Sequence, residues 1–111
     1  MKIINLEAGM PTVEFAHSRL GQELRTAKSC GEKVVKIIHG YGSSGRGGAI
    51  KTDVLATLAQ KKRAGQIKDY VRGEDFSPFS ESARRMVTQF PAMTHDSDWS
   101  RGNDGVTLVL L

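Results

Sequence analysis

Cysteine and long hydrophobic runs are the features this sequence has least of. One cysteine, Cys30, cannot form a disulfide within the chain, so we expect a reducing compartment, the cytoplasm. The longest apolar stretches, 33–38 and 106–111, fall far short of the roughly 18 residues of a membrane span, which argues against a membrane protein. The amino end reaches an acid at Glu7, too early for a signal peptide.

Chain length and the distribution of charge indicate the number of domains and the kind of partner. A chain of 111 residues is the size of one hydrophobic core, so we expect a single domain over residues 1–111. The 16 bases and 12 acids are unevenly placed: residues 19–63 carry ten bases against three acids, whereas 69–111 are acidic. A basic segment of this kind indicates either a solvated surface or a face that binds polyphosphate.

The hydrophobic periods predict alternating strands and helices. Val13, Ala16, Leu20, Leu24 and Ala27 trace one buried helical stripe, with Thr12 as its N-cap. Residues 33–38 are apolar on both faces, which is typical of a central strand. The predicted order is strand 2–6, helix 13–29, strand 33–38, a helix from 47 or 48 to 63, strand 66–72, a short helix 79–90 behind a Ser77-Pro78 cap, a polar loop 92–104, and strand 106–111. This order predicts a two-layer α/β domain with a small mixed sheet.

A glycine-rich stretch separates the second predicted strand from its helix. Residues 39–48 read His-Gly-Tyr-Gly-Ser-Ser-Gly-Arg-Gly-Gly. Such a strand-to-helix loop can hold phosphate through backbone amides and the helix N-terminus. A dinucleotide fingerprint is disfavoured because no acid follows about 20 residues later at a strand end, and a P-loop fails because Arg46-Gly47 stands where Lys-Ser/Thr is required.

A phosphate polymer therefore remains as the guest of this loop. The residues expected to contact nucleic acid are His39, Gly40, Tyr41, Gly42, Ser43, Ser44, Gly45, Arg46 and Lys51. The amides of Gly40, Gly42 and Gly45 and the charges of Arg46 and Lys51 would contact phosphate, and Tyr41 could stack on a base.

Two sets of residues raise other chemistry. His39 at the mouth of the loop could act as an acid, base or metal ligand, or could merely hydrogen-bond the loop. His95-Asp96-Ser97-Asp98 offers oxygen ligands, but a calcium loop counted from Asp96 would have Arg101 and Thr107 where glycine and glutamate are required. We therefore predict no metal site there.

Three separated stretches together resemble the small MutS-related (Smr) domain family. Leu6-Glu7-Ala8-Gly9-Met10 followed by Pro11-Thr12-Val13-Glu14-Phe15-Ala16 resembles its opening Leu-Asp-x-His-Gly and Thr-Val-Glu-x-Ala. Ile37-Ile38-His39-Gly40-Tyr41-Gly42 with Lys51 resembles its Ile-Ile-His-Gly-x-Gly motif, and Gly105-Val106-Thr107 its closing Gly-x-Thr. The resemblance implies a βαβαββ sandwich, similar also to the C-terminal domain of bacterial translation initiation factor three. It further implies a nucleic-acid-binding module of a kind whose members include nicking endonucleases.

The departures from that family bear on its chemistry. Glu7 stands for the family's aspartate, and Gly9 stands where the family has histidine, so a proton-transferring or ligating ring is missing there. Tyr41 replaces a frequent lysine. The helix at 79–90 is an insertion that could cover the sheet edge, dock a partner or add to the core.

Three functions follow from these observations. The first is a domain that binds the DNA or RNA backbone through the His39–Arg46 loop, with weak or lost nuclease activity. The second is a nicking endonuclease dependent on Mg²⁺ or Mn²⁺, with Glu7 as metal ligand or base and His39 as acid. The third is a non-catalytic domain that binds a protein partner through the inserted helix or the acidic segment.

Overall fold

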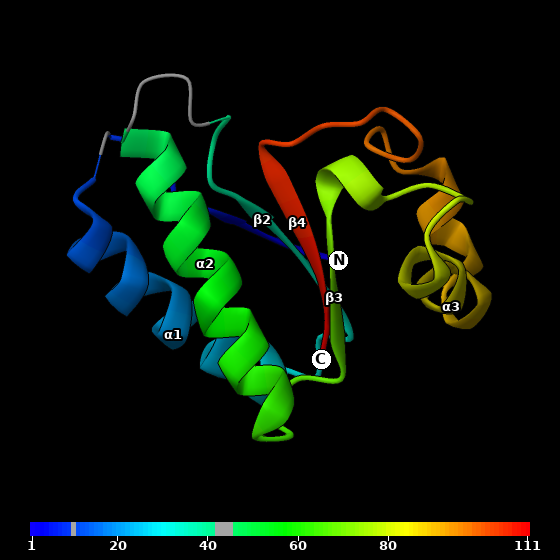
Figure 1. The fold of residues 1–111 in the computed structure, drawn as a ribbon. Helices are drawn as coiled ribbons and strands as arrows, with labels where there is room; N and C mark the ends of the chain where they lie inside the picture. The colour runs from blue at the N-terminus through cyan, green and yellow to red at the C-terminus, as the bar shows by residue number, and fades with distance from the viewer. Residues whose placement is uncertain (10, 42–45) are drawn as a thin grey trace.

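A four-stranded mixed sheet forms the centre of the domain (Figure 1). The computed structural model describes residues 1–9, 11–41 and 46–111. The strands are β1 (Lys2–Asn5), β2 (Val34–Ile38), β3 (Asp69–Arg72) and β4 (Val106–Leu110). They lie in the order β1-β2-β4-β3, with β1 parallel to β2 and both β2 and β3 antiparallel to β4. The apolar strands β2 and β4 are therefore central, as predicted for residues 33–38.

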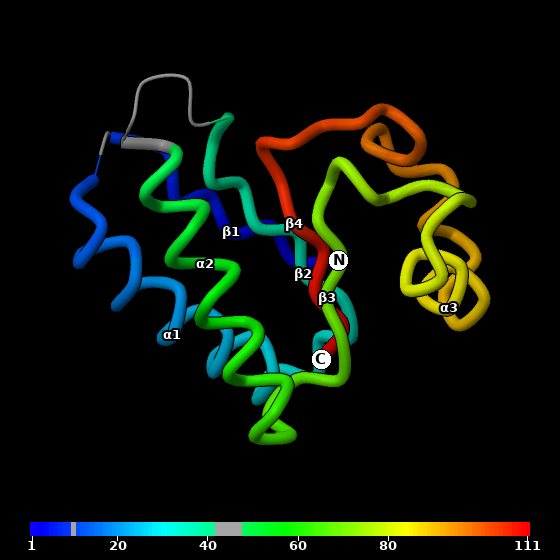
Figure 2. The backbone as a smooth tube through the Cα atoms, viewed as in Figure 1, coloured from blue at the N-terminus to red at the C-terminus, as the bar shows by residue number. Residues whose placement is uncertain are grey.

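Two long helices cover one face of the sheet (Figure 2). They are α1 (Val13–Ser29) and α2 (Arg46–Arg63). The Thr12 hydroxyl accepts a hydrogen bond from the amide of Phe15 at 3.1 Å, which confirms the predicted N-cap of α1. Ala16, Leu20, Leu24 and Ala27 are buried in the same core cluster as Val35 and Ile37, so the predicted stripe of α1 is the one that faces the sheet.

The inserted segment covers the other face of the sheet. It comprises the 3₁₀ turn η1 (Gly73–Asp75), the helix α3 (Glu81–Gln89) and the 3₁₀ turn η2 (Pro91–His95). Phe76, Ala83 and Met86 are buried against strand residues such as Leu108, so the insertion adds a second core. The α/β fold with a mixed four-stranded sheet is confirmed, and the two layers expected from its βαβαββ core become three.

Three boundaries differ from the sequence prediction. The N-cap of α3 is Ser80, whose hydroxyl accepts from the Ala83 amide at 3.2 Å, so the Ser77-Pro78 cap was wrong. Residues 66–68 are not strand, because the Gln66 amide closes the end of α2 on the Lys61 carbonyl. Part of the expected loop 92–104 lies in η2.

Among the residues described, no helix combines the length and apolarity that a membrane crossing requires.

Lys36 is the one strand residue that breaks the apolar run of β2, and its ammonium is buried beneath the insertion. It lies 2.6 Å from Asp96 Oδ1 and 2.6 Å from Asp98 Oδ2. Burial alone would lower the pKa of Lys36, but the hydrogen bonds and charges of the two carboxylates outweigh it and raise that pKa. Asp96 and Asp98, considered above as metal ligands, are thus the counterions of this lysine.

Replacing Lys36 by methionine leaves two carboxylates close together without their cation. We expect Lys36→Met to lower the free energy of unfolding by about 3 kcal/mol, because removing one partner of a buried ion pair strands the other. Urea denaturation measures this loss. Adding Asp96→Asn and Asp98→Asn to Lys36→Met should recover part of it, and equal stability of Lys36→Met and the wild type would refute the account.

Candidate functional site

The predicted site residues converge where β1 and β2 end and β4 begins. Glu7 follows β1, His39 follows β2, and Gly105 precedes β4. The Gly105 carbonyl accepts hydrogen bonds from the amides of His39 (3.0 Å) and Gly40 (3.1 Å). These bonds fix the exit of β2 against the entry of β4 and bring the second and third family-like motifs together.

The His39 ring is fully buried beneath this junction. It continues the alternation of Val35 and Ile37, so it points to the face covered by α1 and α2. Its Nδ1 lies 3.0 Å from the Gly40 carbonyl, which can only accept, so Nδ1 carries the proton. Nε2 of the neutral ring then accepts from the Thr107 hydroxyl at 2.9 Å. Burial lowers the pKa of His39, and the positive charge of Lys51 lowers it further, although the hydrogen bond to Gly40 opposes both.

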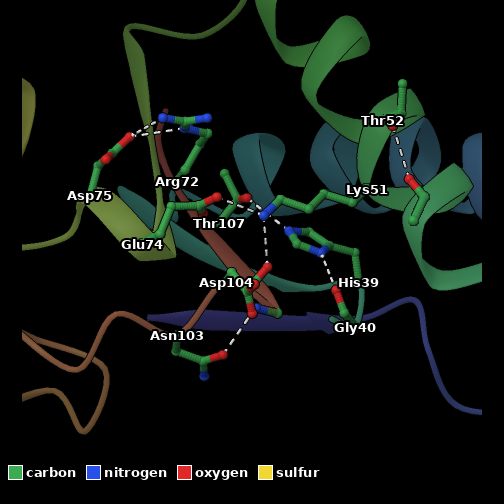
Figure 3. A network of polar contacts seen from close by, with 12 residues as sticks. His39, Gly40, Lys51, Thr52, Arg72, Glu74, Asp75, Asn103, Asp104 and Thr107 are labelled. Carbon is green, nitrogen blue, oxygen red and sulfur yellow. Dashed lines mark hydrogen bonds and ion pairs between the residues drawn. The ribbon is translucent and has the colours of Figure 1, made fainter. Parts of the chain in front are cut away.

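Lys51 joins the start of α2 to η1 and to the turn before β4 (Figure 3). Its ammonium donates to Glu74 Oε2 at 2.8 Å and to the Asp104 carbonyl at 2.9 Å. Burial would raise the pKa of Glu74, but the hydrogen bond and charge of Lys51 outweigh it and lower that pKa. The Lys51 charge, predicted to contact phosphate, is therefore engaged within the domain.

Gly40 occupies a position that only glycine fits well. Its φ is +89°, and a Cβ there would lie 3.3 Å from both Cδ and Oε1 of Glu7. Because its amide donates to Gly105, that amide is not directed to a phosphate as the sequence prediction had it. Glu7 is exposed and lies over this turn, so the acid of the first motif and the glycine of the second are in contact.

Tyr41 is the exposed aromatic residue of the site. Its side chain contacts the backbone at Gly105, where an added Cβ would lie 3.1 Å from Tyr41 Cε1. The residue is 64% exposed. Tyr41 is therefore supported by the sheet on one side and open to a ligand on the other.

The structure thus brings Glu7, His39, Gly40, Tyr41 and Lys51 together. Gly42, Ser43, Ser44 and Gly45 lie outside the described residues, and Arg46 is the first residue of α2. The sequence analysis missed Glu74, which is placed by Gly73: a Cβ on that glycine would overlap the Asn103 carbonyl oxygen. Nothing in the pattern of charges marked Glu74, whereas Thr107, a polar residue in an apolar strand, was visible in the third motif.

A metal site at this junction would need several ligating side chains close together. Within residues 1–9, 11–41 and 46–111, no cluster of three or more His, Cys, Asp or Glu side chains could hold a metal ion. Glu7 lies over the Gly40 turn, and Glu74 is paired with Lys51.

Comparison with known proteins now identifies the family. The model of the Smr domain matches residues 8–75, more than half of the chain, so this chain belongs to the Smr domain family. That family consists of nucleic-acid-binding domains that include nicking enzymes. The crystal structure of the Smr domain of Thermus thermophilus MutS2 matches with a TM-score of 0.61 and 21% identity, covering 100% of this chain and 98% of that chain. No curated protein matches the sequence.

The lowered pKa of His39 makes stability depend on pH. Between the ordinary value of 6.5 and the lower folded value, the unfolded chain binds more protons than the folded one. Stability is therefore full above that ordinary value and is lost as pH falls below it. We expect urea denaturation to show a lower free energy of unfolding at about pH 5 than at about pH 7, with a smaller difference in His39→Gln.

Exposed His95 supplies the control for this measurement. His95→Gln should keep the wild-type pH dependence. If His39→Gln showed the same pH dependence as the wild type, burial of a neutral His39 would not be the cause.

Proposed function

We propose that this domain binds the phosphate backbone of nucleic acid at the junction of the His39–Arg46 loop and the start of α2. Membership of the Smr family supports binding of nucleic acid in general. The placement of α2 supports this particular end of the domain, because the first amides of a helix and its dipole favour an anion. Arg46 is the first residue of that helix.

The observation that carries the proposal is the exposed Tyr41 ring, which the Gly105 backbone supports beside this junction. Aromatic side chains bind unpaired bases by stacking, without reading their sequence. His39 and Lys51 act here as positioning residues. His39 holds the Gly40 carbonyl, and Lys51 fixes α2 against η1 and the turn before β4.

The geometry favours binding over cleavage. Both ring nitrogens of His39 are engaged inside the domain, so this ring has no free nitrogen to protonate a leaving group. The position of the family's other histidine is Gly9, with a φ of +78°. Among the described residues, Glu7 is the exposed acid that contacts the Gly40 turn, and one carboxylate cannot take the acid and the base role together.

Removing the Tyr41 ring should weaken binding selectively. We expect Tyr41→Ala to raise the Kd for a labelled duplex with a single-stranded overhang about tenfold, since one stacked base contributes about 1–3 kcal/mol. Fluorescence anisotropy, with DNA and with RNA probes, measures the Kd. Phe79 is the matched control, because it is 95% exposed on the opposite layer, and Phe79→Ala should bind as the wild type does. Equal losses in both variants would contradict the proposal.

Cleavage is tested separately on supercoiled plasmid with Mn²⁺ or EDTA, with the protein stripped before electrophoresis. We expect no metal-dependent nicks, because His39 is buried and engaged. Nicks that require Mn²⁺ and disappear in Glu7→Gln would establish the endonuclease hypothesis instead.

A further inference from the structure

Two of the cations at the loop end of the domain are neutralised by neighbouring carboxylates. Lys51 is paired with Glu74, and Arg72 is paired with Asp75 at 2.7 Å. Glu7 adds a further exposed acid beside Gly40. Affinity for nucleic acid comes largely from lysine and arginine side chains that neutralise phosphates. We therefore look for a second surface of the domain that carries unpaired cations.

Positively charged side chains cluster at the C-terminal end of α2, away from the loop. Arg25 and Lys28 from the end of α1, and Lys61 from the end of α2, line one cleft of about 290 Å³ with Leu24, Gln66, Ile67 and Leu111. Lys28 and Lys61 both donate to Gln66, which joins the two helix ends. Lys62 and Arg63 end α2, and Lys68 follows the turn. We name this set the basic pole: Arg25, Lys28, Lys61, Lys62, Arg63 and Lys68.

The basic pole holds more charge than the local structure requires. Two helices end there, and each helix dipole contributes about half a negative charge. Six cations exceed that amount several-fold. Asp69 adjoins the pole, but it is shared between Lys62 and Arg85. Arg25, Arg63 and Lys68 are exposed and make no ion pair with another described residue.

One exposed stripe of α2 connects the two ends of the domain. Ala49, Thr52, Ala56 and Gln60 recur at helical spacing, are all exposed, and lead to Arg63. The stripe carries no charge, and its alanines allow close approach of a polymer. Figures 1 and 2 show α2 running from the end of the sheet where β2 exits to the end where β3 starts and the C-terminus lies.

We infer that a nucleic-acid duplex lies along α2 and that the basic pole is its second phosphate contact. This inference rests on the proposed function, to which it adds the substrate form and the direction of binding. An 18-residue helix spans about 27 Å, which is about 8 base pairs at roughly 3.4 Å each. One duplex of that length or more reaches both the start of α2 and the pole. Its phosphates would meet the N-terminus of α2 at one end of the neutral stripe and the cations of the basic pole at the other.

The test removes three charges from the pole without touching the Tyr41 junction. The variant is Arg25→Gln with Arg63→Gln and Lys68→Gln. The control is Arg19→Gln with Arg84→Gln and Arg101→Gln, which removes the same charge from positions outside the pole. Circular dichroism checks the fold of both. Anisotropy with a labelled 16-base-pair duplex bearing a short overhang is measured over a range of salt concentrations.

We expect the pole variant to bind at least tenfold more weakly at low salt, with a salt slope about 2 to 3 smaller, because each lost phosphate contact removes about 0.9 from that slope. The control variant should keep nearly the wild-type affinity and salt slope. If the wild type binds and the two variants lose affinity equally, the pole is not a contact, although the proposed function stands; the pole would then be free for an acidic protein. If the wild type does not bind any probe, the proposed function fails as well.

Discussion

The ammonium group of Lys51 is the contact on which the arrangement of the site depends. It donates to Glu74 after β3 and to the Asp104 carbonyl before β4, so the first turns of α2 are held against η1 and against the turn that precedes β4. The neutral His39 ring lies buried in the same junction and holds the Gly40 carbonyl. Lys51, which was expected to contact a phosphate, therefore serves as a structural cation. The surface that remains exposed for a ligand at this junction consists of Tyr41 and the start of α2.

A second buried lysine is neutralised by carboxylates of the inserted segment. Lys36 is buried on the face of the sheet opposite to α1 and α2, and Asp96 and Asp98 of the inserted segment neutralise it. Phe76 and Trp99 pack edge to face at 4.8 Å between their ring centroids, so an aromatic pair adds to the same layer. Three of the ten bases counted between residues 19 and 63, namely Lys36, Lys51 and Lys62, are therefore paired within the fold. Arg25, Lys28, Lys61 and Arg63 lie at the ends of α1 and α2 that are remote from the loop.

Local sequence patterns predicted most of the fold. The Thr12 cap, the Leu20–Leu24 stripe and the apolar β2 run each specify structure through nearby residues, and all three are confirmed. The cap of α3 was misplaced by three residues because Ser77 and Ser80 both precede helical sequence, and only packing of Ala83 and Met86 on the sheet chooses between them. Partners of Lys36 and Lys51 could not be predicted, since 60 and 23 residues separate the members of these pairs. The sequence identified Tyr41 and His39, but it could not show that one is exposed and the other buried.

The most direct test of the account is a map of the amides that respond to a duplex. Backbone amide chemical shifts of the labelled domain would be followed during titration with the overhang duplex. The account predicts perturbations at Tyr41 and Gly105, along Thr52, Ala56 and Gln60 of α2, and at Arg63. Perturbations confined to α3 and η2, with Tyr41 and α2 unchanged, would contradict it.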